Sequence, residues 1–192
     1  MRVAFVDLET SGLDADGWNT VLCAALAEYQ SPEWRENVLV RPPWGRVRTF
    51  RRDQYRDPLW EDRSLCLAID RAIRQYDVVV SWNGLRFDEP FLATRLREYG
   101  IEAARWPRHK DLLYTARYKL RLSSCSLDNV ARHLGIEAKY GVRKTDLDRR
   151  LWRRAIRGDP RAYRYVVEHC EEDVKVLPAV WQELKSLVTE IR

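Results

Sequence analysis

The hydrophobic pattern of the chain begins with an apolar run, Val3–Val6, that leads directly into the alternating stretch Asp7-Leu8-Glu9-Thr10. Valine and phenylalanine are typical of buried strands, so we predict a central β-strand here. Side chains in a strand alternate between its two faces, and Asp7 and Glu9 therefore point the same way. The pattern predicts a buried strand that ends in two carboxylates on one face.

Further apolar runs predict four more strands, at residues 20–29, 36–40, 77–82 and 109–113. The alanines of residues 20–29 leave a helix as an alternative for that segment. The last of these strands is short and leads into a helix that continues through Tyr118. Residues 46–56 are basic and interleaved with aromatic side chains. We predict a loop there, which is either a solvated surface or a contact with nucleic acid.

Apolar residues at helical spacing predict the main helices of the chain. They cover residues 58–76, 88–99, 126–135, 148–157 and 161–187. Pro178 should kink or divide the last of these helices, and residues 140–146 are expected to form a loop. A strand, a helix and another strand in succession imply parallel pairing through a right-handed crossover. The pattern as a whole therefore predicts an α/β protein.

Length and composition narrow the class of protein. The 192 residues are most simply one domain, 1–192. No stretch reaches the roughly 18 unbroken apolar residues of a membrane span. Because the sequence leads straight into the predicted strand, we expect no signal peptide. The four cysteines lie far apart without a C-x-x-C pair, which argues against a zinc cluster and fits the reducing cytoplasm. We expect a cytoplasmic protein, and its net charge of +5 suits an anionic partner such as nucleic acid.

The first two acidic sites lie at the ends of predicted strands. Asp7 and Glu9 repel each other unless a cation lies between them, and Mg²⁺ or Mn²⁺ prefers such hard oxygen ligands. The alternative is a strand end with two solvated acids. Asp88 follows a buried strand and starts a helix, at the edge of an α/β sheet where ligands collect. Its alternative role is that of a helix N-cap.

The third acidic site is on the last predicted helix. His169 and Asp173 are four residues apart and therefore share one helix face. Asp173 could ligate a cation while His169 reaches a water bound to it, and the alternative is an ordinary surface pair. Glu171 and Glu172 should point elsewhere.

Together, the three sites resemble the DEDD superfamily of 3′–5′ exonucleases, which share a ribonuclease H-like fold. The resemblance rests on F-V-D-L-E-T-S-G-L around Asp7, on N-G-L-R-F-D-E-P-F-L around Asp88 and on H-C-E-E-D-V around Asp173. Order and spacing also fit, over nearly the whole chain. The chain is most similar to the branch that includes the YprB-type proteins, which the stretch from Asp111 through Leu127 also resembles. Familiar members of the superfamily carry a tyrosine four residues, or a histidine five residues, before the last aspartate, whereas here, as in the YprB-like branch, a histidine stands four residues before it.

This resemblance implies an α/β, ribonuclease H-like fold in which a mixed five-stranded sheet, of strand order 3-2-1-4-5, is flanked by helices. It also implies hydrolysis of phosphodiester bonds with two bound Mg²⁺ or Mn²⁺ ions. The acids that would hold the ions are Asp7, Glu9, Asp88 and Asp173. His169 would complete the catalytic set as the base that deprotonates the attacking water.

The same resemblance implies that the partner is single-stranded nucleic acid, DNA and/or RNA, degraded from a free 3′ end to 5′-mononucleotides. The candidate contacts to this substrate are Thr10, Leu13, Asn83, Phe87 and Lys144. Ordinary alternatives are core packing for Phe87, a turn for Asn83 and a solvated charge for Lys144. Asp111 is expected to support the site, and the arginines of residues 149–157 could bind the nucleic-acid backbone.

Three alternative functions remain open at the level of sequence. The first is a structure-specific endonuclease on the same fold. The second is a non-catalytic module that binds nucleic acid or joins an assembly. The third is proofreading in trans, in association with a separate polymerase or repair assembly.

Overall fold

The computed structural model describes residues 1–188, and its centre is a mixed five-stranded sheet of order β5-β2-β1-β6-β7. The strands of this sheet are β1 (Val3–Thr10), β2 (Val21–Tyr29), β5 (Trp44–Arg51), β6 (Val78–Ser81) and β7 (Lys110–Asp111). β2 runs antiparallel to both of its neighbours, whereas β6 and β7 continue the sheet in parallel from β1. The predicted α/β class and five-stranded mixed sheet are confirmed.

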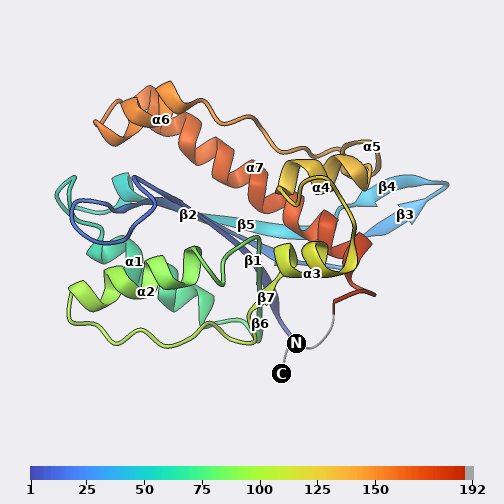
Figure 1. Ribbon diagram of the computed structural model, residues 1–192, viewed down its shortest axis with the longest axis horizontal. Coiled ribbons are helices and arrows are strands. Elements are labelled where there is room, and N and C mark those ends of the chain that lie inside the picture. The colour runs from blue at the N-terminus through green and yellow to red at the C-terminus, as the bar shows by residue number, and fades with distance from the viewer. Residues whose placement is uncertain (189–192) are drawn as a thin grey trace.

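Helices cover both faces of the sheet (Figure 1). α1 and α2 pack on one face, and α3, α4, α5 and the long helix α7 pack on the other, with α6 lying against α7. The helices are α1 (Arg63–Ile73), α2 (Asp88–Glu98), α3 (Leu112–Lys119), α4 (Leu127–His133), α5 (Ile136–Tyr140), α6 (Arg149–Ile156) and α7 (Pro160–Leu184), with a 3₁₀ turn η1 at Arg52–Gln54. No helix within residues 1–188 has the length and apolar character needed to cross a membrane.

The alternation of β1 separates two hydrophobic cores. Ala4, Val6 and Leu8 face the core under α1 and α2, and Val3 and Phe5 face the core under α7. Since strand side chains repeat every second residue, the next two positions on the α7 face are those of the acids at 7 and 9. The two-residue period of one strand thus directs both carboxylates toward α7.

β2 is a strand, so the helical alternative for residues 20–29 is wrong. Every residue from Val21 to Ala27 is buried, because β2 has strands on both edges and helices on both faces. Small side chains at Ala25 and Ala27 face the α7 core and allow that long helix to lie close to the sheet. Burial on both faces therefore explains the alanine-rich composition that made the segment resemble a helix.

The edge strand of the sheet is not the segment that the sequence predicted. Residues 36–40 overlap β4 (Val38–Arg41), which pairs with β3 (Glu33–Arg35) in a separate two-stranded hairpin. The turn of this hairpin places Glu36 and Asn37 at positive φ angles of 48° and 66°, as the type I′ hairpin turn requires.

The predicted loop at residues 46–56 instead contains β5. Val47 packs toward α7 while Phe50 is buried on the opposite face, so the two-residue period of a strand is present. Arginines stand at 46, 48 and 51, next to these two residues, and the guanidinium of Arg48 lies 5.2 Å from the Phe50 ring centroid. An edge strand tolerates such residues because their aliphatic stems pack while their charged ends remain in water.

The remaining differences concern helix boundaries. α1 starts at Arg63 rather than at residue 58, and residues 136–140 form the short helix α5. α7 continues through Pro178 and is not divided there, and it ends at Leu184 rather than at residue 187.

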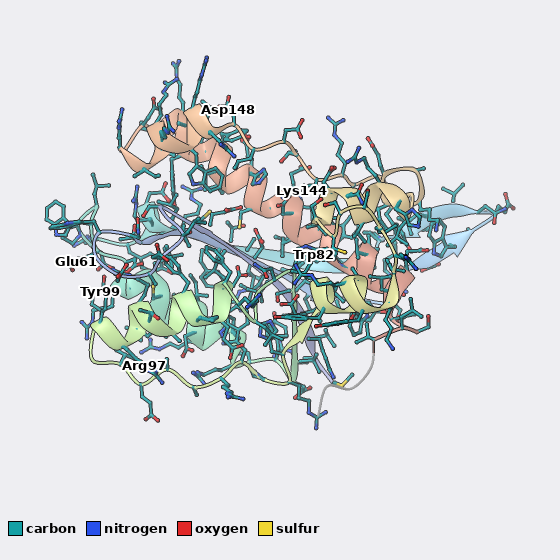
Figure 2. The ribbon with its side chains drawn as sticks, in the orientation of Figure 1. Glu61, Trp82, Arg97, Tyr99, Lys144 and Asp148 are labelled. Carbon is teal, nitrogen blue, oxygen red and sulfur yellow. The ribbon has the colours of Figure 1, made fainter. Side chains whose placement is uncertain are left out.

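A buried ion pair joins the start of α1 to α2. Asp62 is fully buried, and its carboxylate accepts hydrogen bonds from the Arg95 guanidinium (2.9 Å), the Tyr99 hydroxyl (2.8 Å) and the Val21 backbone N–H (2.6 Å). Figure 2 labels Tyr99 near Glu61, the residue before Asp62. This network fixes the helices of one face against the start of β2.

Arg95→Met is expected to lower the free energy of unfolding by about 3–5 kcal/mol, because Asp62 would then be a buried charge without a cation. Urea unfolding would measure the loss. Arg97→Met is the matched control on the same helix, since Arg97 is exposed and should change stability by no more than about 0.5 kcal/mol. A loss below about 1 kcal/mol for Arg95→Met would contradict the role assigned to the ion pair.

Candidate active site

The candidate site lies where the end of β1 meets the middle of α7. Asp7 and Glu9 come from β1, and His169 and Asp173 from α7. Ligand atoms of Glu9, His169 and Asp173 lie within 4.8 Å of one another, and so do ligand atoms of Asp7, Glu9 and Cys170. Two segments more than 150 residues apart in sequence thus bring three carboxylates and an imidazole together.

Two carboxylate oxygens in this cluster have no protein partner. Asp7 Oδ2 and Asp173 Oδ1 are the buried side-chain polar atoms without a hydrogen bond within the described residues. Buried polar atoms are normally satisfied, because leaving one unpaired costs free energy. Divalent cations bound in the cluster would satisfy them, and Mg²⁺ and Mn²⁺ prefer carboxylate oxygens. The residues present therefore fit a site for such a cation.

Burial and mutual repulsion disfavour the ionised acids. Burial, then the charges of Asp173 and Asp88, raise the pKa of Asp7 well above its ordinary value. Burial and the charge of Asp7 do the same to the pKa of Glu9. Burial by itself would lower the pKa of Lys144, but its ion pair with the Asp173 carboxylate outweighs this and raises that pKa.

The free energy of unfolding of the metal-free protein is expected to fall as the pH rises from about 5 to about 7. Burial raises the pKa of Asp88 from 3.8 to about 7, and the pKa values of Asp7 and Glu9 are also raised. The folded state therefore holds more protons than the unfolded state in this window, so stability is greatest below it and is lost as the acids ionise.

His169 acts in the opposite direction, because burial lowers its pKa and the folded state then holds fewer protons on the imidazole. It is one group against the three acids whose pKa values are raised. Hydrogen bonds outweigh burial and lower the pKa of some other acids, such as Asp53 and Glu89. Their contribution to the free energy of unfolding changes at pH values below about 5, outside this window. Unfolding in urea with EDTA at both pH values measures the difference, and Asp88→Asn should shrink it. A free energy of unfolding that rises between pH 5 and pH 7 would contradict the raised pKa values of these three acids.

His169 is held by contacts from outside α7. Its Nδ1 lies 2.7 Å from Thr145 Oγ1, and the Trp152 ring meets the imidazole edge-on at a centroid distance of 5.8 Å. Nε2 lies 3.6 Å from Asp173 Oδ2 and 4.0 Å from Glu9 Oε1. When Nδ1 donates to Thr145, the lone pair of Nε2 faces the carboxylates, which is the orientation that a general base needs.

Asp88 lies beside this cluster rather than within it. It is the first residue of α2, and Phe87 holds the N-cap position, so the N-cap alternative is wrong. Its Oδ1 accepts the Leu8 backbone N–H at 3.0 Å, beyond the point where β1 pairs with β6. Asp88 is 4% exposed, and its charge raises the pKa of Asp7. It is therefore a neighbour of Asp7, at the edge of the candidate metal site.

The turn that carries Asp88 into place is held by Asp111. The Asp111 carboxylate accepts backbone N–H groups of Asn83, Leu85 and Leu113. Asn83 has φ of 65°, and Gly84 approaches so closely that a Cβ there would lie 2.3 Å from Ser81 Oγ. Asp111 has the supporting role that the sequence suggested, because it fixes the turn between β6 and α2.

A serine, a histidine and a glutamate form a second network below this turn. Ser81 Oγ lies 2.7 Å from His109 Nε2, and His109 Nδ1 lies 2.6 Å from Glu89 Oε2. The order resembles a hydrolase triad, but Ser81 is fully buried and also accepts the Gly84 N–H. A substrate cannot reach it, so this network holds the start of α2.

A cavity of about 860 Å³ opens over the acids. Asp7, Glu9, His169 and Asp173 line it, whereas Asp88 does not. All five candidate substrate contacts also line it: Thr10, Leu13, Asn83, Phe87 and Lys144. Leu13 is 83% exposed, and Phe87 packs partly against the α1–α2 core. The catalytic and substrate candidates therefore share one cavity.

Sequence reasoning missed Thr145, Trp152 and Trp82. Trp152 lines the cavity and donates its indole N–H to the Thr10 carbonyl at 3.1 Å. Trp82, at the end of β6, lines the same cavity, and Figure 2 labels it together with Lys144. Trp152 could have been singled out in the sequence, because it is an aromatic residue inside a strongly basic predicted helix. No sequence signal pointed to Thr145.

Cys170 is the cysteine that lies at the acid cluster, next to Asp7 and Glu9. All four are free thiols, and Cys170 donates to the Asp7 carbonyl at 3.5 Å. Burial raises the pKa of the Cys170 thiol above its ordinary value, and a soft sulfur ligand suits Mg²⁺ or Mn²⁺ less well than a carboxylate does. Glu171, as expected, points away from the acids and accepts a hydrogen bond from Thr49 of β5.

Comparison with known proteins identifies the family. The family B DNA polymerase from the hyperthermophilic archaeon Pyrobaculum calidifontis has a similar fold, with a TM-score of 0.69 and 18% sequence identity. That similarity covers 96% of this chain and 24% of the polymerase chain, so this chain spans about a quarter of the polymerase. No protein with a curated description matches. The family model described as RNase_H superfamily matches residues 4–185. Since this match covers nearly the whole chain, the protein belongs to the RNase_H superfamily.

Proposed function

We propose that the protein is a metal-dependent 3′–5′ exonuclease of the DEDD type, in the YprB-like branch, with residues 1–192 acting as one catalytic domain. It would hydrolyse phosphodiester bonds of single-stranded nucleic acid, DNA and/or RNA, to 5′-mononucleotides in the cytoplasm. The superfamily and the ribonuclease H-like fold support a nuclease. The 3′–5′ direction follows the resemblance to the DEDD exonucleases, and the metal and the substrate are argued from the site.

The observation that carries the proposal is the pair of orphan oxygens, Asp7 Oδ2 and Asp173 Oδ1, in a cluster that lines an open cavity. Acids whose only task is structural would be paired with protein donors. Here Lys144 balances one oxygen of Asp173, and Glu9 has no cationic partner within hydrogen-bonding distance among the described residues. The charge balance of the cluster therefore favours a bound divalent cation.

Asp7, Glu9, Asp88 and Asp173 would hold the metal, Mg²⁺ or Mn²⁺ and most simply two ions. Bound there, divalent ions supply activation of a water nucleophile and stabilisation of negative charge on the phosphate. His169 Nε2 accepts the proton of the attacking water, and Thr145 keeps the imidazole in the required orientation. Lys144 lines the same cavity and supplies a positive charge for the phosphate.

Side chains around the cavity suit the end of an unpaired strand. Leu13, Phe87 and Trp82 offer apolar and aromatic surface on which a base can stack, and stacking is the usual mode of single-strand binding. Asn83 supplies a polar group at the same rim. The similarity to part of a family B DNA polymerase supports action on nucleic acid. Association with a separate polymerase or repair assembly is compatible with this proposal.

The test is cleavage of 5′-labelled single strands of DNA and of RNA with Mn²⁺, with Mg²⁺ and with EDTA. A ladder of shortened products that disappears in EDTA is the expected result. A strand blocked by a 3′-phosphate is the matched control and should be shortened more slowly. A single internal product would instead indicate an endonuclease. No cleavage and no Mn²⁺ binding by calorimetry would overturn the proposal and favour a non-catalytic binding module.

A further inference from the structure

Seven exposed arginines gather on α6 and the first turns of α7. We call this surface the arginine corner, and its members are Arg149, Arg150, Arg153, Arg154, Arg157, Arg161 and Arg164. Residues 149–164 contain one acid, Asp159, so seven positive charges and one negative charge leave a net of +6. The whole chain carries +5. The net positive charge of the protein is therefore concentrated at this corner, and the rest of the chain is close to neutral.

The corner is short of partners. Within the described residues, Arg154 is its one member in an ion pair, with Asp159. Arg149 and Arg153 are spaced i,i+4, as are Arg153 and Arg157, and like charges at this spacing destabilise a helix. Arg149 and Arg150 also lie in the first turn of α6, where the helix dipole disfavours cations. An anionic partner would offset the repulsion between these arginines, which solvent and salt only screen.

The other face of α6 reaches the candidate active site. Leu151, Trp152 and Ala155 pack into the α7 core, and Trp152 also lines the active-site cavity. Figure 2 shows nitrogen-tipped side chains projecting from α6 on the side away from α7, near the labelled Asp148. The arginine corner thus begins within one helical turn of the cavity and continues outward from it.

The chemistry of this outer face favours one form of nucleic acid. Unpaired strands are held by grooves that combine charge with aromatic stacking, but the exposed positions of residues 149–161 carry no aromatic side chain. A duplex presents two rows of closely spaced phosphates and hides its bases. Exposed arginines at 150, 153 and 157, along one side of α6, match such a surface.

We propose that the arginine corner binds the phosphate backbone of a double-stranded region, adjacent to the single-stranded 3′ end that enters the cavity. This inference rests on the proposed function and specifies its substrate class further, as a duplex with a 3′ overhang. The contacts carry no base specificity, because they reach phosphates alone.

The experiment compares the triple variant R150Q/R153Q/R157Q with the wild type by equilibrium binding in EDTA, where nothing is cleaved. The probes are a labelled duplex with a 3′ overhang and the overhang strand alone. For the duplex, three lost contacts should weaken binding by about 500-fold at about 0.1 M salt and make the salt slope shallower by about 2.7. For the overhang strand, the two proteins should differ by less than about threefold.

The matched control is R71Q/R97Q/R105Q, which also removes three exposed arginines. Arg97 and Asp148, labelled on opposite sides of the molecule in Figure 2, show the separation of the two surfaces. Equal losses for the control and the corner variant would overturn the proposal in favour of general charge attraction. An unchanged duplex affinity would overturn it outright, and an equal loss for the lone strand would assign the corner to unpaired nucleic acid.

Failure here can be distinguished from failure of the proposed function. Binding in EDTA needs no catalysis, whereas the nuclease proposal is tested by cleavage of a bare single strand. A protein that cleaves bare strands while its corner variant binds the duplex normally would refute this inference alone.

Discussion

Asp7→Asn is expected to lower phosphodiester hydrolysis by on the order of 10³-fold or more and to stabilise the metal-free protein. Asparagine keeps the shape of aspartate but is a poorer ligand for a hard cation, so catalysis should be lost. In the metal-free state the same change removes an acid whose ionised form is disfavoured by burial and by the charges of Asp173 and Asp88. A loss of activity accompanied by a gain in stability is typical of an acid retained for metal binding.

Cleavage with Mn²⁺ and thermal unfolding in EDTA measure the two effects. The melting temperature should rise by a few degrees, as expected for relief of about 1 kcal/mol in a protein of this size. Asp16→Asn is the control, since Asp16 is exposed and should change neither property. An Asp7→Asn protein that stays active would refute the metal site, and one that melts lower would show that Asp7 stabilises the fold.

Local periodicity was sufficient to predict the two parts of the site that lie within single elements. The two-residue period of β1 placed Asp7 and Glu9 on one face, and the 3.6-residue period of α7 paired His169 with Asp173. Each statement requires only the geometry of one strand or one helix. That these two elements meet was implied by the family resemblance, because periodicity carries no information about which elements pack together.

The periodicity of single elements could not predict contacts between elements that are distant in the sequence. Thr145 reaches His169 from a loop, and the Leu8 N–H takes one oxygen of Asp88 because β6 ends before β1 does. The edge strand β5 was misjudged for a related reason. Its arginines look like a solvated loop until Phe50 and Val47 are seen to pack on opposite faces. Burial, unlike propensity, is decided by tertiary neighbours.

Lys144 illustrates how the site can be stable before it is loaded. Its ammonium pairs with one oxygen of Asp173, while the other oxygen has no hydrogen-bond partner among residues 1–188. Lysine thus offsets part of the acid cluster without using all of its ligand atoms. A flexible side chain from a loop can also yield this position to a metal ion at less cost than a residue of the sheet, since fewer contacts hold it.

His169→Gln is expected to lower kcat by roughly 10²–10⁴-fold, the usual contribution of a general base. The imidazole is positioned for this role, because Thr145 occupies Nδ1 and leaves Nε2 facing the carboxylates. Burial lowers the pKa of His169 below its ordinary value near 6.5, so the neutral, proton-accepting form predominates at neutral pH. His133→Gln is the matched control, since that histidine is exposed on α4.

A second role must be separated from the first, because His169 lies close enough to Glu9 and Asp173 to be a metal ligand. Titration with Mn²⁺ distinguishes the two. If His169 is only a base, the Mn²⁺ affinity of His169→Gln should stay within about threefold of the wild type. If His169 is a metal ligand, the variant should bind Mn²⁺ about 10-fold more weakly or worse. In the wild type, kcat should also decline as acid protonates Nε2, and this limb should vanish in His169→Gln. Full activity of the variant at neutral pH would rule out His169 as the base.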